Sequence, residues 1–201
     1  MFAPPQEQRD EDEHLGQAMP DMTDEYRGLT AREFAAMPRE GLRLELVRGE
    51  IVAMPPAFAN HGVAAAHLGN FLGWYIASQE LGVALAATRF ELAADTVRAP
   101  DFAFIQASRV TPGAIGRDWV RVVPDLVVEV VSSGDRPRAI GAKVRMWLDA
   151  GVWLVWVVYP TRKRGVVHRS GVEPVTLGVD DQLDGADVVP GFTAQVATIF
   201  G

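Results

Sequence analysis

Four charged side chains stand at positions where the sequence is otherwise apolar. Glu129 lies in the middle of the apolar run at residues 126–131, and Asp101 directly precedes another apolar run. Glu45 interrupts a third run, and Lys143 borders the apolar stripe of a predicted helix. Burying a charge costs free energy unless an opposite charge or hydrogen bonds compensate it. These four side chains are therefore the candidates for chemistry.

Carboxylates that converge from neighbouring strands repel one another. A shared proton, a cationic side chain or a divalent metal ion relieves that repulsion. Because the chain has no cysteine, a site built from oxygen ligands favours a hard cation such as Mg²⁺ or Mn²⁺. A lysine at the same point could orient or help deprotonate a water molecule and stabilise developing negative charge. Such a set suits metal-assisted hydrolysis of a phosphodiester.

Each candidate also has a purely structural interpretation. Glu129 could pair with an arginine, because buried charges are usually paired. Asp101 follows a proline and could simply open a strand, and Glu45 could face solvent from an edge strand. Lys143 could extend along Trp147 with its amine in water. Residue type alone leaves both interpretations open.

The elements that would position these side chains follow from periodicity and turn signals. Thr30 and Glu33 fit a capping box at the start of a short helix, and Gly49 fits the turn of a β-hairpin. Helical spacing predicts helices at residues 60–79 and 138–150. Apolar runs predict strands at residues 43–47, 51–54, 82–87, 90–93, 97–105, 126–131, 153–158, 165–169, 173–177 and 193–199.

The order of these elements predicts a mixed α/β fold in which helices cover one central sheet. The strand, helix and strand between residues 126 and 158 predict a right-handed crossover between parallel strands. The run at 126–131 is the most apolar and is expected at the centre of the sheet. A length of 201 residues suits one domain, which we expect at residues 27–201.

Composition narrows the class of protein further. Residues 1–26 hold eight acidic side chains and one basic side chain, and so carry the whole net charge of −7; we expect them to form an acidic disordered tail. The absence of cysteine excludes disulfides, thiolate metal sites and thiol nucleophiles. No apolar run is long enough for a membrane span or a signal core, so we expect no membrane partner and a cytoplasmic location.

Four motifs occur in an order that resembles the Uma-type family of restriction endonucleases, over roughly residues 29–170. The first comprises residues 45–56, ELVRGEIVAMPP, followed by His61; the second is VRAPD, ending at Asp101. The third is PDLVVEVVS at residues 124–132. The fourth is Lys143 and Trp147 followed by GV and by Trp156, Val158 and Pro160. Trp147 stands where the family usually has tyrosine.

The resemblance implies the PD-(D/E)xK restriction-endonuclease-like superfamily: a mixed central β-sheet flanked by helices, here with an N-terminal β-hairpin. It implies Asp101 and Glu129 as ligands of Mg²⁺ or Mn²⁺, and Lys143 as the catalytic lysine. Lys143 comes from the following helix, because the usual lysine position, two residues after Glu129, holds Val131. The resemblance further implies three minor features, namely Glu45 as an additional acid near the metal, His61 as a substrate contact, and DNA as the substrate.

Two functions therefore stay open. One is a Mg²⁺-dependent endonuclease that hydrolyses DNA phosphodiester bonds. The other is a catalytically silent nuclease-fold module that binds nucleic acid or a protein, which the electrically neutral body of the chain favours. A homodimer is compatible with cleavage of both DNA strands, by analogy with other nucleases.

Overall fold

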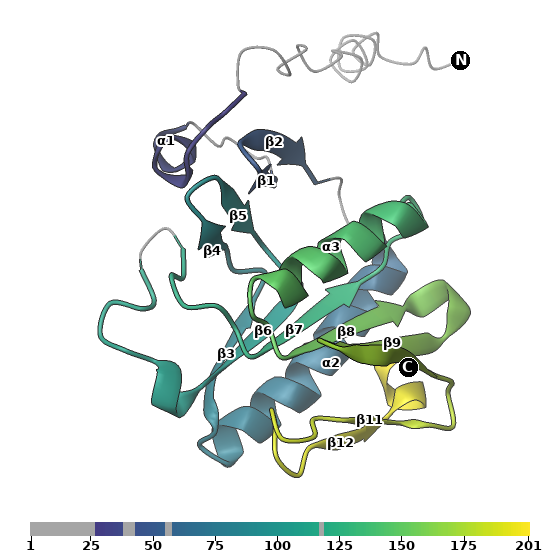
Figure 1. Cartoon of the computed structure of the whole chain (residues 1–201). Helices are drawn as coiled ribbons and strands as arrows, with labels where there is room; N and C mark the ends of the chain where they lie inside the picture. The colour runs from purple at the N-terminus through teal and green to yellow at the C-terminus, as the bar shows by residue number, and fades with distance from the viewer. Residues whose placement is uncertain (1–26, 38–42, 55–57, 117–118) are drawn as a thin grey trace, which may run out of the picture.

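The computed structural model describes residues 27–37, 43–54, 58–116 and 119–201. The tail predicted at residues 1–26 lies outside the described residues. A large sheet is covered by one long helix on each face, and a smaller sheet stands beside it (Figure 1). Among the described residues, none of the helices is both long and apolar enough to cross a membrane.

The large sheet has six strands in the order β10-β9-β8-β7-β6-β3. Its β7 and β8 run parallel, and its other neighbouring strands run antiparallel. The sheet is therefore mixed, as predicted. The strands are β3 (Gly82–Ala86), β6 (Phe102–Gln106), β7 (Leu126–Val130), β8 (Leu154–Tyr159), β9 (Arg164–Arg169) and β10 (Val172–Leu177).

Two helices bury the two faces of this sheet. Helix α2 (Ala59–Ser78) packs on one face, together with the C-terminal segment that contains β11 (Gln182–Asp184), β12 (Thr193–Gln195) and the 3₁₀ turn η4 (Val196–Ile199). Helix α3 (Pro137–Asp149) packs on the other face. Strand β7 lies between them and is buried along its whole length, which is why its sequence loses the alternation of a half-exposed strand.

The smaller sheet has the order β2-β1-β5-β4. Its strands are β1 (Leu44–Val47), β2 (Glu50–Ala53), β4 (Phe90–Ala93) and β5 (Thr96–Arg98). The predicted hairpin is present, and both Arg48 and Gly49 have positive φ in its turn. Helix α1 (Ala31–Ala36) begins with the predicted capping box of Thr30 and Glu33.

The prediction of one strand at residues 97–105 is wrong. The chain forms β5 in the small sheet and β6 in the large sheet, and it bends between them at Pro100 and Asp101. Proline has no N–H for a ladder hydrogen bond, so it favours a break there. The bend joins the two sheets.

The strand predicted at residues 193–199 is also only partly correct. Strand β12 ends at Gln195, and the 3₁₀ turn η4 follows. Val196 and Ile199 are both buried there. A spacing of three residues places both side chains on one side of a 3₁₀ turn, whereas a strand would have pointed them to opposite faces. Strand β11 and the short turn η2 (Ala107–Arg109) have no counterpart in the prediction.

Candidate active site

The carboxylates of Asp101 and Glu129 come from facing positions of two antiparallel strands. Phe102 of β6 pairs with Val128 of β7, so one further step along both strands brings Asp101 opposite Glu129. Directly opposite residues have Cβ atoms about 5 Å apart. The two acids, which a long connection separates in the sequence, are thus neighbours at one end of the inner strands β6 and β7.

Helix α3 holds both oxygens of the Glu129 carboxylate. The Lys143 ammonium donates to Oε2 at 2.7 Å, and the Trp147 indole Nε1–H donates to Oε1 at 2.7 Å. Residues four apart lie on the same face of a helix, so one turn of α3 supplies both donors. Burial raises the pKa of Glu129, and Lys143 is the strongest influence in the opposite direction.

The Asp101 carboxylate has different partners. Its Oδ2 accepts a hydrogen bond from the backbone N–H of Val130 at 2.7 Å, and its Oδ1 lies 3.2 Å from His61 Nε2 in the first turn of α2. Burial pushes the pKa of Asp101 upward, but these two contacts outweigh it and leave that pKa below its usual value. The hydrogen bond to Asp101 in turn raises the pKa of His61.

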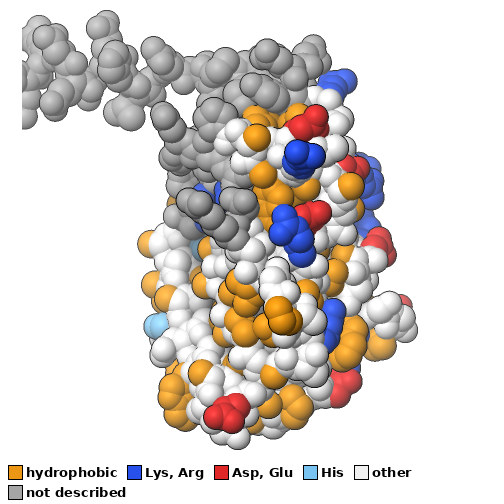
Figure 2. Space-filling model, turned by 90° about the vertical axis from the view of Figure 1, so that its left-hand side faces the viewer, with side chains coloured by type: hydrophobic (Ala, Val, Ile, Leu, Met, Phe, Trp, Pro, Cys, Tyr) orange, Lys and Arg blue, Asp and Glu red, His pale blue; other side chains and the backbone are white. Residues whose placement is uncertain are grey.

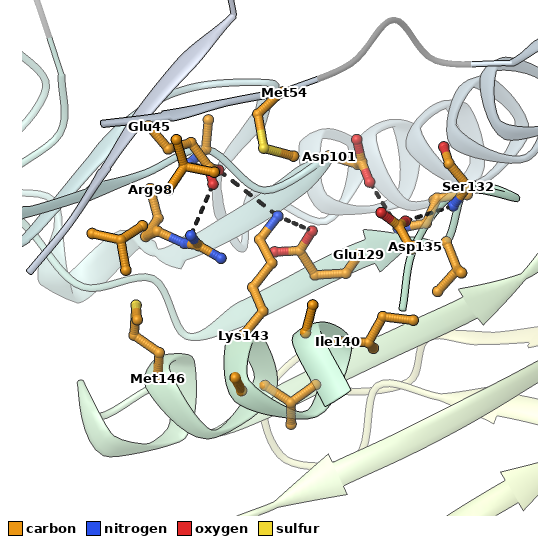
Figure 3. A pocket seen from close by; sticks show the side chains of 18 of the residues that line it. Glu45, Met54, Arg98, Asp101, Glu129, Ser132, Asp135, Ile140, Lys143 and Met146 are labelled. Atoms are coloured by element: carbon orange, nitrogen blue, oxygen red, sulfur yellow. Dashed lines mark hydrogen bonds and ion pairs between the residues drawn. The ribbon is translucent and has the colours of Figure 1, made fainter. Parts of the chain in front are cut away.

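Glu45 is buried in β1, at the end of the small sheet nearest to α3. Its Oε1 accepts a hydrogen bond from the Ala99 N–H at 2.9 Å and lies 3.8 Å from Lys143 Nζ; its Oε2 lies 3.0 Å from Arg98 Nη1. Burial lowers the pKa of Lys143, but the Glu129 and Glu45 carboxylates outweigh burial and hold it above its ordinary value. The Lys143 ammonium thus lies between two acids (Figure 3).

All five residues suggested by the sequence line one pocket of about 390 Å³ between the hairpin β1–β2 and helix α3. Glu45 comes from the small sheet, Asp101 from the bend before β6, Glu129 from the large sheet, and Lys143 and His61 from the two covering helices. The structural alternatives considered for Glu45 and Lys143 therefore do not apply: Glu45 is 1% exposed, and the Lys143 side chain is 16% exposed.

The sequence also contains a second Pro-Asp pair, and its role differs. Asp125 follows Pro124 as Asp101 follows Pro100, but Asp125 is fully buried away from the pocket. It accepts a hydrogen bond from the Gln106 N–H and forms an ion pair with Arg109. This carboxylate ties the start of β7 to the end of β6.

Two contributors to the site were not identified from the sequence. Trp147 was noted as an apolar neighbour of Lys143 and as part of a family motif but not as a hydrogen-bond donor to Glu129, although its four-residue spacing from that lysine was a usable signal. Arg98 precedes the Pro-Asp pair by two residues, and its pairing with Glu45 depends on the contact of β5 with β1. No local pattern indicates that contact.

The donor chemistry of the pocket fits a divalent cation. Mg²⁺ is usually held by one or two carboxylates and completes its shell with water and substrate phosphate oxygens. Asp101 and Glu129 provide such a pair. The described residues contain no group of three acidic or histidine side chains placed to hold a metal, so most of the ligands of a bound ion would come from water or substrate.

Charge around the pocket is balanced rather than basic. Four acids line it, Glu45, Asp101, Glu129 and Asp135, against three permanent cations, Arg43, Arg98 and Lys143. The face of the molecule in Figure 2 likewise shows basic side chains standing singly among acidic and apolar ones. A polyanion would therefore gain little from these side chains unless a bound cation added positive charge.

Replacement of Trp147 by Phe tests the hydrogen bond to Glu129. We expect a loss of about 2 kcal/mol in the free energy of unfolding, because a buried carboxylate oxygen loses its donor. Trp156→Phe is the matched control: Trp156 is also 0% exposed, but its indole N–H has no hydrogen-bond partner within the described part of the chain. Urea denaturation of both variants measures their losses in the free energy of unfolding. Equal losses would show that the hydrogen bond contributes nothing.

Comparisons with known proteins agree with this architecture. The profile of the Uma2 family, described as "Putative restriction endonuclease", matches residues 31–197. A crystal structure of a protein from Anabaena variabilis ATCC 29413, described as a putative nuclease belonging to DUF820, superposes with a TM-score of 0.73 at 17% sequence identity. The superposition covers 86% of this chain and 97% of that one. No protein of curated function matches the sequence.

Proposed function

Because the chain belongs to the Uma2 family, we propose that its pocket hydrolyses DNA phosphodiester bonds with the help of Mg²⁺ or Mn²⁺. The observation that carries the proposal is the placement of Asp101 and Glu129 on facing strands, with the Lys143 amine 2.7 Å from Glu129. We further propose that residues 27–201 act as one nuclease domain. Homodimerisation and the cytoplasmic location stay predictions.

In this proposal Asp101 and Glu129 hold the cation. When bound, the cation would polarise the scissile phosphate and lower the pKa of a water molecule. Lys143 stays a cation, because it lies between two carboxylates; it donates hydrogen bonds and stabilises developing negative charge rather than accepting a proton. His61 Nε2 lies 3.2 Å from the Asp101 carboxylate, which would also bind the cation. We therefore propose that His61 contacts the substrate phosphate.

Removal of the metal is the direct test. We expect purified protein to cleave supercoiled plasmid DNA in Mg²⁺ or Mn²⁺, and to leave it intact in EDTA. Titration calorimetry with Mn²⁺ should show one binding event that disappears in Asp101→Asn. Cleavage that continues in EDTA would contradict the metal-dependent mechanism.

One observation favours the second candidate function, a catalytically silent module. Both oxygens of Glu129 and both oxygens of Asp101 already have protein partners. A site satisfied in this way could be a purely structural ion-pair network. Calorimetry distinguishes the two functions: a silent module would bind neither Mn²⁺ nor Mg²⁺, yet would still bind nucleic acid or a protein.

A further inference from the structure

The pocket has two chemically different halves. Its floor carries the acids and bases described above. The walls on either side of these charged groups are apolar: Val52 and Met54 line the hairpin side, and Ile140 and Met146 line the α3 side (Figure 3). Met54 lies across the pocket from Ile140 and Met146 in Figure 3. Val52 is 38% exposed and the other three are half-buried, so these side chains are accessible from outside.

With the proposed cation held by Asp101 and Glu129, a ligand that fills both halves would combine an anionic group with an apolar group a few bonds away. A nucleotide has this construction, because one sugar joins its phosphate to a flat base. The pocket volume of about 390 Å³ lies within the usual range for small-ligand sites. A base that is paired and stacked in a duplex cannot enter such a pocket unless it leaves the stack.

We propose that the apolar half of the pocket receives one unpaired base beside the scissile phosphate, so that the preferred substrate is single-stranded nucleic acid. This inference rests on the proposed function. Thioether and aliphatic walls adapt to different shapes and offer no strong hydrogen-bonding groups to the base edge. The site therefore accepts different bases with little sequence preference.

The distribution of charge supports a single strand over a duplex. Affinity for duplex DNA comes mainly from phosphate contacts with lysine and arginine. Residues 27–201 have no net charge, and the acids that line the pocket outnumber its permanent cations. Proteins that bind single strands gain much of their affinity from contacts with the bases. In this pocket the aliphatic and thioether walls would supply the contacts with the base.

The test compares three DNA substrates of one sequence in Mg²⁺: a single strand, the duplex, and a single strand with one abasic position. We expect the single strand to be cleaved at least about tenfold faster than the duplex, since the duplex must first extrude a base. Cleavage next to the abasic position should be reduced by about tenfold, because the apolar contact is lost.

Variants of Met54 then locate the effect. Met54→Gln should lower kcat/KM on the intact single strand by about tenfold and should no longer distinguish the abasic strand. Met54→Leu, which keeps the wall apolar, should retain the preference for the intact strand over the abasic strand. Val172→Gln makes the same kind of change on the exposed edge strand β10, away from the pocket, and should have no effect.

The outcomes separate this inference from the proposed function. If the duplex is cleaved as fast as the single strand and Met54→Gln has no effect, the inference is wrong while the nuclease proposal stands. If no substrate is cleaved, the nuclease proposal fails. Fluorescence anisotropy of a labelled single strand in EDTA then tests whether the pocket binds an unpaired base. The base site is supported if the wild type binds the abasic strand more weakly than the intact strand and Met54→Gln does not. Equal binding of the two strands by the wild type would overturn the base site.

Discussion

The Asp101→Asn variant is expected to fold normally and to lose at least about 10²-fold in the rate of DNA cleavage. Asparagine has the same shape and can still accept the hydrogen bond from the Val130 N–H. It has lost the negative charge that would bind a divalent cation. The free energy of unfolding should fall by only about 1 kcal/mol, because one charged hydrogen bond to His61 becomes neutral.

Asp125→Asn provides the contrast within the same chain. Asp125 stands in the second Pro-Asp pair, is fully buried and is paired with Arg109. Loss of its charge leaves the arginine without its partner, and we expect a cost of about 3 kcal/mol in the free energy of unfolding. The protein that remains folded at low temperature should cleave DNA at the wild-type rate. If Asp101→Asn keeps more than a tenth of the activity, the assignment of Asp101 to the metal is wrong.

The central residues of the candidate site could be selected from the sequence because each is an exception to a local pattern; their roles stay predictions. Glu129 interrupts a strand that is apolar on both faces, and Asp101 directly precedes the apolar run at residues 102–105. Lys143 lies on the apolar side of an amphipathic helix. A buried charge costs free energy unless it is paired. A charged residue within an apolar pattern is therefore a candidate for an ion pair or a function, and it can be recognised without coordinates.

The features of the candidate site that could not be predicted from the sequence depend on contacts between distant segments. The pairing of β1 with β5 brings Glu45 to Arg98 and Lys143, and it rests on the register between Leu46 and Val97. The helices at residues 60–79 and 138–150 were predicted to within one residue of α2 and α3, because their periodicity is local. The break within residues 97–105 was missed, although Pro100 was a local signal for it.

Replacement of Lys143 by Met is expected to lower both activity and stability, and the loss of stability should depend on pH. The variant leaves Glu129 buried with only the Trp147 N–H as a donor. Breaking a buried ion pair in this way costs about 3 kcal/mol near neutral pH. The only other lysine, Lys163, is exposed, so Lys163→Met should change neither property.

The sign of the pH dependence follows from the pKa of Glu129. Burial raises that pKa above 4.5, and without Lys143 it rises further. The folded variant then binds more protons than the unfolded chain at pH values above 4.5 and below the raised pKa. The free energy of unfolding therefore falls as pH rises through this window, and the deficit relative to the wild type shrinks as pH is lowered. Urea denaturation of the variant and the wild type in EDTA at several pH values measures this deficit in the free energy of unfolding.

A double variant separates the structural effect of Lys143 from its catalytic effect. Lys143→Met combined with Glu129→Gln replaces the buried charge by a neutral amide of the same shape, which can still accept the Trp147 hydrogen bond. Most of the lost stability should return and its additional pH dependence should vanish, whereas cleavage should stay absent because both functional groups are gone. If the double variant regained activity along with stability, Lys143 and Glu129 would be structural residues, and the site of hydrolysis would lie elsewhere.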